Sequence, residues 1–170
     1  MIKNLFIIRH ATAEDIGNLT VVRDYDRELI SKGIMESAKL GKALSDYFPK
    51  VDAIYSSGAA RALNTATIVA EQIKFDTDLI EIKEALYGSG PRGYLEVLNS
   101  IPDEIENAVI VGHNPDISYF TDYLTRDDVG GSLKKASLVH LRFEGFQWNE
   151  LSQNSGGFIF RIEGKKLEAN

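Results

Sequence analysis

Short runs of apolar residues recur along the chain, separated by segments in which apolar residues return at helical spacing. The run at 5–8 consists of leucine, phenylalanine and isoleucine, a composition typical of a strand that is buried on both faces. Runs at 51–55 and 108–111 have a similar character, and 79–82 is a weaker candidate. Strands of this kind, alternating with helices, predict a mostly parallel sheet.

Helical periodicity appears after the first run. Apolar or small residues recur every three or four positions over 34–48, and Pro49 is expected to end that helix. A second helix is expected over 58–73, with Ser57 as its N-cap. Both helices follow a predicted strand or precede one, as α/β folds require.

Two further helices are expected in the second half. The glycine-rich stretch at 88–93 reads as a loop, and a helix should follow it to about residue 100. Asn114-Pro115 is typical of a helix start and predicts a helix that ends near Leu124.

The tail has a different pattern. Segments 139–143 and 158–162 alternate apolar and polar residues, which predicts two half-exposed strands joined by a turn-rich connection. His140 falls on the polar side of the first one and is interpreted as a surface residue. The expected fold is an α/β three-layer sandwich. It has a mostly parallel central sheet, a late antiparallel strand pair and helices on both faces, and 1–170 forms a single domain.

Composition narrows the function. The 170 residues carry 19 basic and 25 acidic side chains, for a net charge of −6, which argues against a nucleic-acid or membrane surface as partner. The chain has no cysteine, so disulfides, a thiol nucleophile and thiolate zinc sites are excluded. No signal peptide or membrane span is recognisable, and a soluble cytoplasmic protein is expected.

Candidate chemistry gathers where predicted strands end. His10 and Arg9 end the first strand region, and His113 follows the run at 108–111. Arg61 lies in the first turn of the helix that begins after Ser57. Ligands of open α/β sheets bind beyond the carboxyl ends of the strands. Guanidinium forks and helix N–H groups suit a phosphate, and a histidine ring can accept a phosphoryl group covalently.

The same residues allow other interpretations. A single histidine at a strand end is usually a polar residue at the rim of a sheet, but two histidines and two arginines at equivalent ends favour a site. Asp116 or Glu14 could join the histidines around a metal ion, yet the arginines would repel a cation. We therefore expect no metal and no cofactor. Nucleotide-binding glycine motifs are absent from the sequence.

Three motifs resemble those of the histidine phosphatase superfamily, which includes the cofactor-dependent phosphoglycerate mutases. Arg9-His10-Ala11 resembles its Arg-His-Gly motif, and the segment from Ser57 through Arg61 to Thr65-Ala66 resembles its Ser-Pro-x-x-Arg-Ala-x-x-Thr-Ala motif. Val111-Gly112-His113-Asn114-Pro115 resembles the motif of its second histidine. The segment from Arg27 to Gly33 and the chain's ending around Trp148, Gly156-Gly157 and 165–167 resemble the short SixA-type phosphohistidine phosphatases, so the likeness covers nearly the whole chain.

The resemblance implies roles for these residues. His10 would be the nucleophile, Arg9 and Arg61 would hold the phosphoryl oxygens, and His113 would bond the same group and stabilise the transition state. Apart from the resemblance, the expected helix start at Ser57 and Gly58 would add N–H groups that bind the phosphate. By its position, Glu84 is the candidate general acid, or else a solvated carboxylate at a strand end.

Two positions depart from the family pattern. Ala11 replaces a glycine, so a positive φ should not be needed there. Gly58 replaces a proline, which should loosen the turn before the helix. Neither change removes a reacting group.

The function expected from the sequence is a metal-independent phosphatase with a phosphohistidine intermediate, acting on phosphohistidine in a protein. The alternatives are a phosphatase or mutase for a small phosphorylated metabolite, or a phosphate-binding module without turnover. The partner would be a phosphohistidine domain or a small phosphorylated substrate, with no nucleic acid and no membrane.

Overall fold

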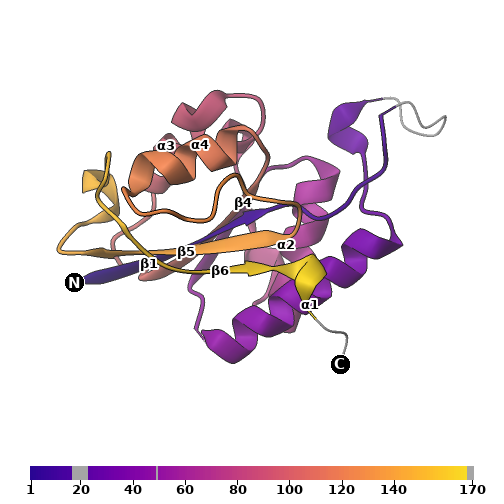
Figure 1. The fold of residues 1–170 in the computed structure, drawn as a ribbon, viewed down its shortest axis with the longest axis horizontal. Coiled ribbons are helices and arrows are strands. Elements are labelled where there is room, and N and C mark those ends of the chain that lie inside the picture. Colours follow the sequence, from indigo (N-terminus) through magenta and orange to yellow (C-terminus); the bar gives the residue numbers. More distant parts are fainter. Residues whose placement is uncertain (17–22, 49, 168–170) are drawn as a thin grey trace.

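A six-stranded mixed sheet forms the centre of the computed structural model, which describes residues 1–16, 23–48 and 50–167 (Figure 1). The strands stand in the order β3-β2-β4-β1-β5-β6. Their bounds are β1 Ile2–Arg9, β2 Ala53–Ser56, β3 Glu81–Ile82, β4 Asn107–Gly112, β5 Ser137–Glu144 and β6 Gly157–Glu163.

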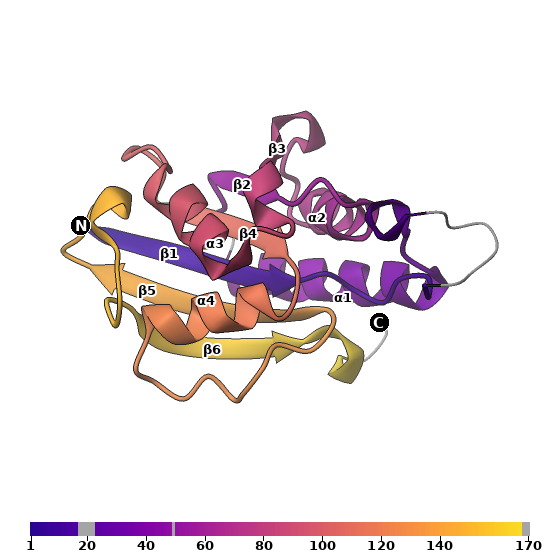
Figure 2. The ribbon, with the colours of Figure 1, turned by 90° about the horizontal axis from the view of Figure 1, so that it is seen from above.

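Strand directions agree with the prediction. β1, β2, β3 and β4 run parallel, whereas β5 pairs antiparallel with β1 and β6 pairs antiparallel with β5 (Figure 2). The three apolar runs form the parallel centre, because a strand covered on both faces needs apolar side chains at every position. The weak candidate at 79–82 is a strand only at Glu81–Ile82, after a 3-10 turn at Thr77–Leu79.

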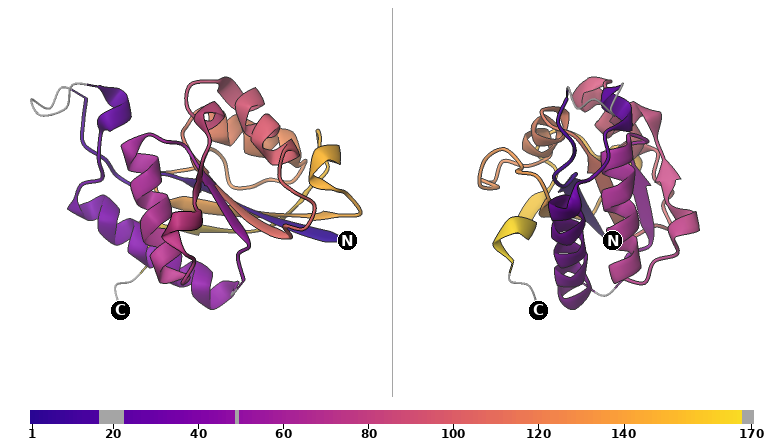
Figure 3. Two further views of the ribbon diagram at one scale, coloured as in Figure 1. Left: turned by 180° about the vertical axis from the view of Figure 1, so that it is seen from behind. Right: turned by 90° about the vertical axis from the view of Figure 1, so that its right-hand side faces the viewer.

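Helices cover both faces of the sheet, which confirms the three-layer arrangement (Figure 3). On one face α1 (Ser31–Tyr47) and α2 (Ala60–Gln72) pack over Phe6 and Ile8. On the other, α3 (Gly90–Asn99) and α4 (Asp116–Leu124) pack over the alternate side chains of the same strands. None of the helices in the described part of the chain has the length and hydrophobicity needed to cross a bilayer.

The predicted starts of the first two helices were wrong. α1 begins at Ser31, one turn before the first apolar position that signalled it, and Pro49, its expected stop, lies outside the described residues. α2 begins at Ala60 with Ala59 as its N-cap, so Ser57 is not the cap. The Ser57 hydroxyl accepts a bond from Ala59 N in the turn before the helix.

The starts of the other two helices also differ. α3 begins inside the predicted loop, at Gly90. Pro115 occupies the N-cap position of α4, and the side chain of Asn114 does not cap it. Asn114 Nδ2 instead donates to the carbonyl of Leu133 at 2.7 Å, which ties this turn to the segment before β5.

The interpretation of His140 as a surface residue was wrong. Its ring is 3% exposed and stacks on Phe6, with a centroid separation of 4.4 Å. Phe48, from the end of α1, and Phe160, from β6, cover it from other sides. The alternating pattern correctly placed His140 on the face of β5 opposite to its apolar neighbours. That face is not exposed to solvent, because Phe48 from a distant helix packs over it.

Candidate active site

Three neighbouring strand ends bring the predicted residues together. β4 lies between β2 and β1, and the residue after each strand is Ser57, His113 or His10. His10 N donates to the carbonyl of Gly112, and Ser57 N donates to that of Val111, both at 3.1 Å. The rings of His10 and His113 are 5.2 Å apart between centroids. The carboxyl edge of the sheet therefore holds both histidines side by side, as ligand sites of open sheets do.

Two arginines join this edge. Arg9 is the last residue of β1, and its Nη1 donates to the carbonyl of Leu133 at 3.1 Å. Arg61 is the second residue of α2 and is 6% exposed. Burial, together with the nearby charge of Arg61, lowers the pKa of Arg9. Two guanidinium groups that repel each other at a partly buried edge form a site of positive potential.

The tautomer of His10 follows from its one ring contact. Its Nδ1 lies 2.8 Å from the carbonyl oxygen of Ala11, and a carbonyl can only accept. Nδ1 therefore carries the hydrogen, and Nε2 keeps a free lone pair. Burial, opposed by the Ala11 bond and reinforced by the charges of His113 and Arg61, lowers the pKa of His10 to about 3. A neutral ring with a free Nε2 is the nucleophilic form of histidine.

His113 has the matching arrangement. Its Nε2 lies 2.8 Å from the Ser57 hydroxyl, which already accepts from Ala59 N. The hydroxyl hydrogen can point at Nε2, which leaves the ring hydrogen on Nδ1. Burial and the charge of Arg61 lower the pKa of His113 to about 4. With that tautomer, the ring is a neutral donor at Nδ1, and Ser57 holds its Nε2.

Three donors at this edge have no partner in the described chain. They are Arg9 Nε, Arg61 Nε and His113 Nδ1, and all three atoms are buried. A buried donor without an acceptor costs about 1–3 kcal/mol, so a bound acceptor at these three atoms would be stabilising. An acceptor-rich tetrahedral anion such as phosphate supplies oxygens to all of them. The arrangement is therefore chemically suited to an anion beside the free Nε2 of His10.

The loop after His10 is fixed from two helices. Ala11 N donates to Thr65 Oγ1 of α2 at 3.1 Å. Glu36 of α1 is 5% exposed, and its Oε1 accepts from Thr12 N at 3.1 Å and from Thr12 Oγ1 at 2.7 Å. These bonds hold the carbonyl of Ala11, and through it the ring of His10. Ala11 itself is absent from the positive-φ residues of the described chain, as expected for this position.

Sequence reasoning missed one acidic side chain and its neighbours. Asp24 accepts hydrogen bonds from Arg61, Arg27 and Tyr87. Burial opposes ionisation of this carboxyl, but the three bonds outweigh it and hold the pKa of Asp24 well below its usual range. Asp24 lies in a short 3-10 turn, η1 (Asp24–Asp26), without apolar periodicity. Only its family-like neighbour Arg27 gave any signal in the sequence.

Glu84 lies at the rim of this edge. It is exposed and begins the 3-10 turn at Glu84–Leu86, and its Oε1 accepts from the Tyr25 hydroxyl at 3.2 Å. A Cβ on Gly58 would collide with that hydroxyl and come within 2.9 Å of Glu84 Oε1. The glycine at 58 therefore leaves room for Tyr25 and Glu84 beside the start of α2. A proline would occupy this space.

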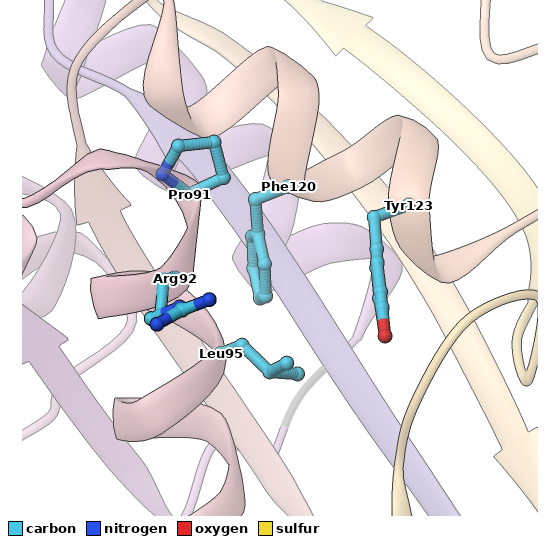
Figure 4. A pocket seen from close by; sticks show the side chains of 5 residues that line it. All are labelled: Pro91, Arg92, Leu95, Phe120 and Tyr123. Atoms are coloured by element: carbon cyan, nitrogen blue, oxygen red, sulfur yellow. The ribbon is translucent and has the colours of Figure 1, made fainter.

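The predicted residues do not line the pocket between α3 and α4. Between α3 and α4 there is a space of about 260 Å³, lined by Pro91, Arg92, Leu95, Phe120 and Tyr123 (Figure 4). Neither of the two histidines nor either of the two arginines of the candidate site lines this pocket. Within the described residues, no group of three or more histidine, aspartate and glutamate side chains is arranged to hold a metal ion.

Buried neutral histidines predict acid sensitivity. Burial lowers the pKa of His140 to about 4, as it lowers those of His10 and His113. Below about pH 6.5 the histidines of the unfolded chain become protonated, whereas these three rings stay neutral in the folded chain. The free energy of unfolding therefore falls as pH falls. Together, the three rings lower the free energy of unfolding by on the order of 3 kcal/mol between pH 6 and pH 5. Urea unfolding at both pH values measures it, and equal free energies would mean that the folded rings bind protons too.

The chain is similar to known proteins in part of its sequence and in its fold. Residues 5–88 match the family model of the histidine phosphatase superfamily, branch 1. That range contains Arg9, His10 and Arg61, whereas His113 lies beyond it. An uncharacterized protein of Mycobacterium tuberculosis is 32% identical over 97 residues, which are 57% of this chain and 58% of that protein. The chain therefore matches only somewhat more than half the length of this relative.

Solved structures match over nearly the whole chain. A SixA phosphohistidine phosphatase from Nakamurella multipartitia has a TM-score of 0.82 at 24% identity, over 96% of each chain. The protein histidine phosphatase SixA complexed with tungstate matches with a TM-score of 0.78 at 18% identity, over 97% of this chain and 99% of that one. A mycobacterial glucosyl-3-phosphoglycerate phosphatase matches with a TM-score of 0.68 at 16% identity, over 94% of this chain and 98% of that one. At these identities the likeness concerns the fold.

Proposed function

Because the chain belongs to the histidine phosphatase superfamily, we propose that it is a metal-independent phosphatase that carries the phosphoryl group on His10. Residues 1–170 would form one domain with this activity. The observation that supports it most is the set of buried, unpartnered donors around a neutral histidine: Arg9 Nε, Arg61 Nε and His113 Nδ1. An enzyme for phosphoryl transfer needs such donors and a nucleophile within the same site.

The reaction has two displacements. In the first, the lone pair of His10 Nε2 attacks phosphorus and a P–N bond forms. The bond from phosphorus to the leaving group breaks, and the leaving group takes the electron pair and a proton. In the second, water attacks phosphorus, the P–N bond breaks, and its electron pair returns to Nε2 while the proton passes to solvent. The hydrogen bond from Nδ1–H to the Ala11 carbonyl is kept in both steps. It stabilises the positive charge that develops on the ring when Nε2 bonds to phosphorus.

The remaining groups stabilise the transferring phosphoryl group. Arg9, Arg61 and His113 donate to its oxygens, where negative charge is concentrated in the transition state. Ser57 acts through His113 by fixing its tautomer. Glu84 is proposed as the proton donor to the leaving group. Its support is its place at the rim, beside the start of α2.

For substrate class we propose phosphohistidine on a protein. The P–N bond is activated, and solvent can protonate a departing imidazole, so an exposed acid such as Glu84 suffices. Arg27, a third arginine beside Arg61, is occupied by Asp24 and the Glu14 carbonyl, which leaves it little capacity for the carboxylate of a small metabolite. The alternatives remain a metabolite phosphatase or mutase, favoured by the fold of the glucosyl-3-phosphoglycerate phosphatase, and a binding module without turnover.

A competition experiment between substrates tests the proposed substrate class. A phosphohistidine-bearing domain is offered together with a panel of sugar and glycerate phosphates, and kcat/KM is measured for each. We expect the highest value for the phosphohistidine domain. A clearly higher value for a sugar or glycerate phosphate would replace this substrate class by a metabolite phosphatase. Phosphate binding without release from any substrate would favour the binding module.

A further inference from the structure

Asp24 grips the end of the Arg61 side chain. Its backbone carbonyl accepts from Arg61 Nη1 at 2.7 Å, and its Oδ2 accepts from Arg61 Nη2 at 2.9 Å. One residue thus holds both terminal nitrogens of a guanidinium that is almost fully buried. We infer that Asp24 is a positioning residue that orients Arg61 toward the phosphoryl group and limits how tightly the site holds a free anion.

The two bonds to Asp24 determine which edge of the Arg61 guanidinium is available to a ligand. Nη1 and Nη2 each direct one of their two hydrogens at Asp24, and the Nε–H is buried without a partner in the described chain. A planar guanidinium offers its donors in a rigid fork, so fixing one edge fixes the direction of the other. Asp24 therefore determines the direction in which Arg61 donates.

Asp24 is itself held in place. Its Oδ1 accepts from Arg27 Nη1 at 2.8 Å, and Oδ2 also accepts from the Tyr87 hydroxyl at 2.7 Å. Tyr87 in turn packs edge-on against His113, with ring centroids 5.4 Å apart. The carboxylate thus connects Arg61, Arg27 and a tyrosine that contacts the second histidine, so that its position is coupled to the whole site.

The charge of Asp24 has a second effect. It offsets the positive charge of Arg61 and Arg27, which would otherwise attract any phosphate, including the released product. A site that held product tightly would turn over slowly. Removing the charge should therefore raise phosphate affinity while the loss of orientation lowers kcat. A merely structural residue would lower both.

The chain contains a matched control two residues away. Asp26 lies in the same turn η1 and pairs with Arg23 at 2.8 Å, but both side chains are more than half exposed. Asp26→Asn removes the same charge from the same turn without touching Arg61. It should leave kcat and phosphate affinity unchanged, since an exposed ion pair contributes little.

The test compares wild type, Asp24→Asn and Asp26→Asn. Turnover of an aryl phosphate and binding of inorganic phosphate by calorimetry are measured for each. For Asp24→Asn we expect kcat to fall about tenfold or more and phosphate to bind roughly threefold to tenfold tighter. Tyr87→Phe, which removes one bond to Asp24 but keeps its charge, should lower kcat by less and leave phosphate affinity close to that of the wild type.

The outcomes separate this inference from the proposed function on which it rests. If Asp24→Asn matches Asp26→Asn, or if it weakens phosphate binding along with kcat, the positioning role is overturned. If the wild-type chain releases phosphate from no substrate, the proposed function fails. The phosphate affinities then decide the inference alone: tighter binding by Asp24→Asn supports it, and equal affinities for the two variants overturn it.

Discussion

Replacing His10 by alanine is expected to reduce kcat/KM by about 10⁴-fold or more, because it removes the atom that accepts the phosphoryl group. Donors alone cannot replace it, since Arg9, Arg61 and His113 carry no lone pair directed at phosphorus under the proposed tautomers. Hydrolysis of an aryl phosphate, measured with wild type and variant at equal concentration, gives the ratio.

Two controls accompany the His10 variant. His10→Ala should still bind inorganic phosphate, because the three buried donors remain. Its unfolding midpoint should stay close to that of the wild type, since a buried neutral ring with one hydrogen bond is lost from the edge of the sheet and not from its core. Retention of more than a tenth of the wild-type activity would contradict the assignment of the nucleophile.

Arg61→Ala is expected to lower kcat/KM for an aryl phosphate by roughly 10²- to 10³-fold, corresponding to about 3–4 kcal/mol of transition-state stabilisation. Glu84→Ala should lower it by less than about threefold, because an aryl leaving group needs no proton. The structure supports this ranking. Arg61 is buried with an unpartnered Nε, whereas Glu84 is exposed and bonded only weakly by Tyr25.

Arg61→Lys serves as the second variant. It keeps a positive charge near Asp24, so that this carboxylate retains a cation beside it in addition to Arg27, but it lacks the planar fork. It should recover only part of the lost activity. If Glu84→Ala proves more damaging than Arg61→Ala on the aryl phosphate, the roles of the two residues are wrongly assigned.

The parallel centre of the fold was predictable because its strands are buried on both faces, so local composition alone identifies them. Their ends then placed His10 and His113 together without any knowledge of packing. The limits of local patterns explain the errors. His140 alternates correctly, but the aromatic cover from Phe48 belongs to a helix almost a hundred residues earlier.

Residues that act through long-range hydrogen bonds were the hardest to foresee. Asp24 contacts Arg61 and Tyr87, 37 and 63 residues away, from a turn with no periodic pattern. Ser57 was recognised as polar and well placed, yet the sequence favoured a helix cap over its contact with His113. Glu36 is a buried acid on an otherwise ordinary helix, and only the fold reveals Thr12 as its partner.

The most direct test of the account is to trap the phosphorylated protein. Wild-type protein is mixed with saturating aryl phosphate, quenched in alkali at times within the first turnovers, digested and analysed by mass spectrometry. We expect one added phosphoryl group, stable to base and labile to acid, on the peptide that contains His10. Phosphate release at the normal rate, with the His10 peptide unmodified at every quench time or with the label on another residue, would contradict the covalent mechanism.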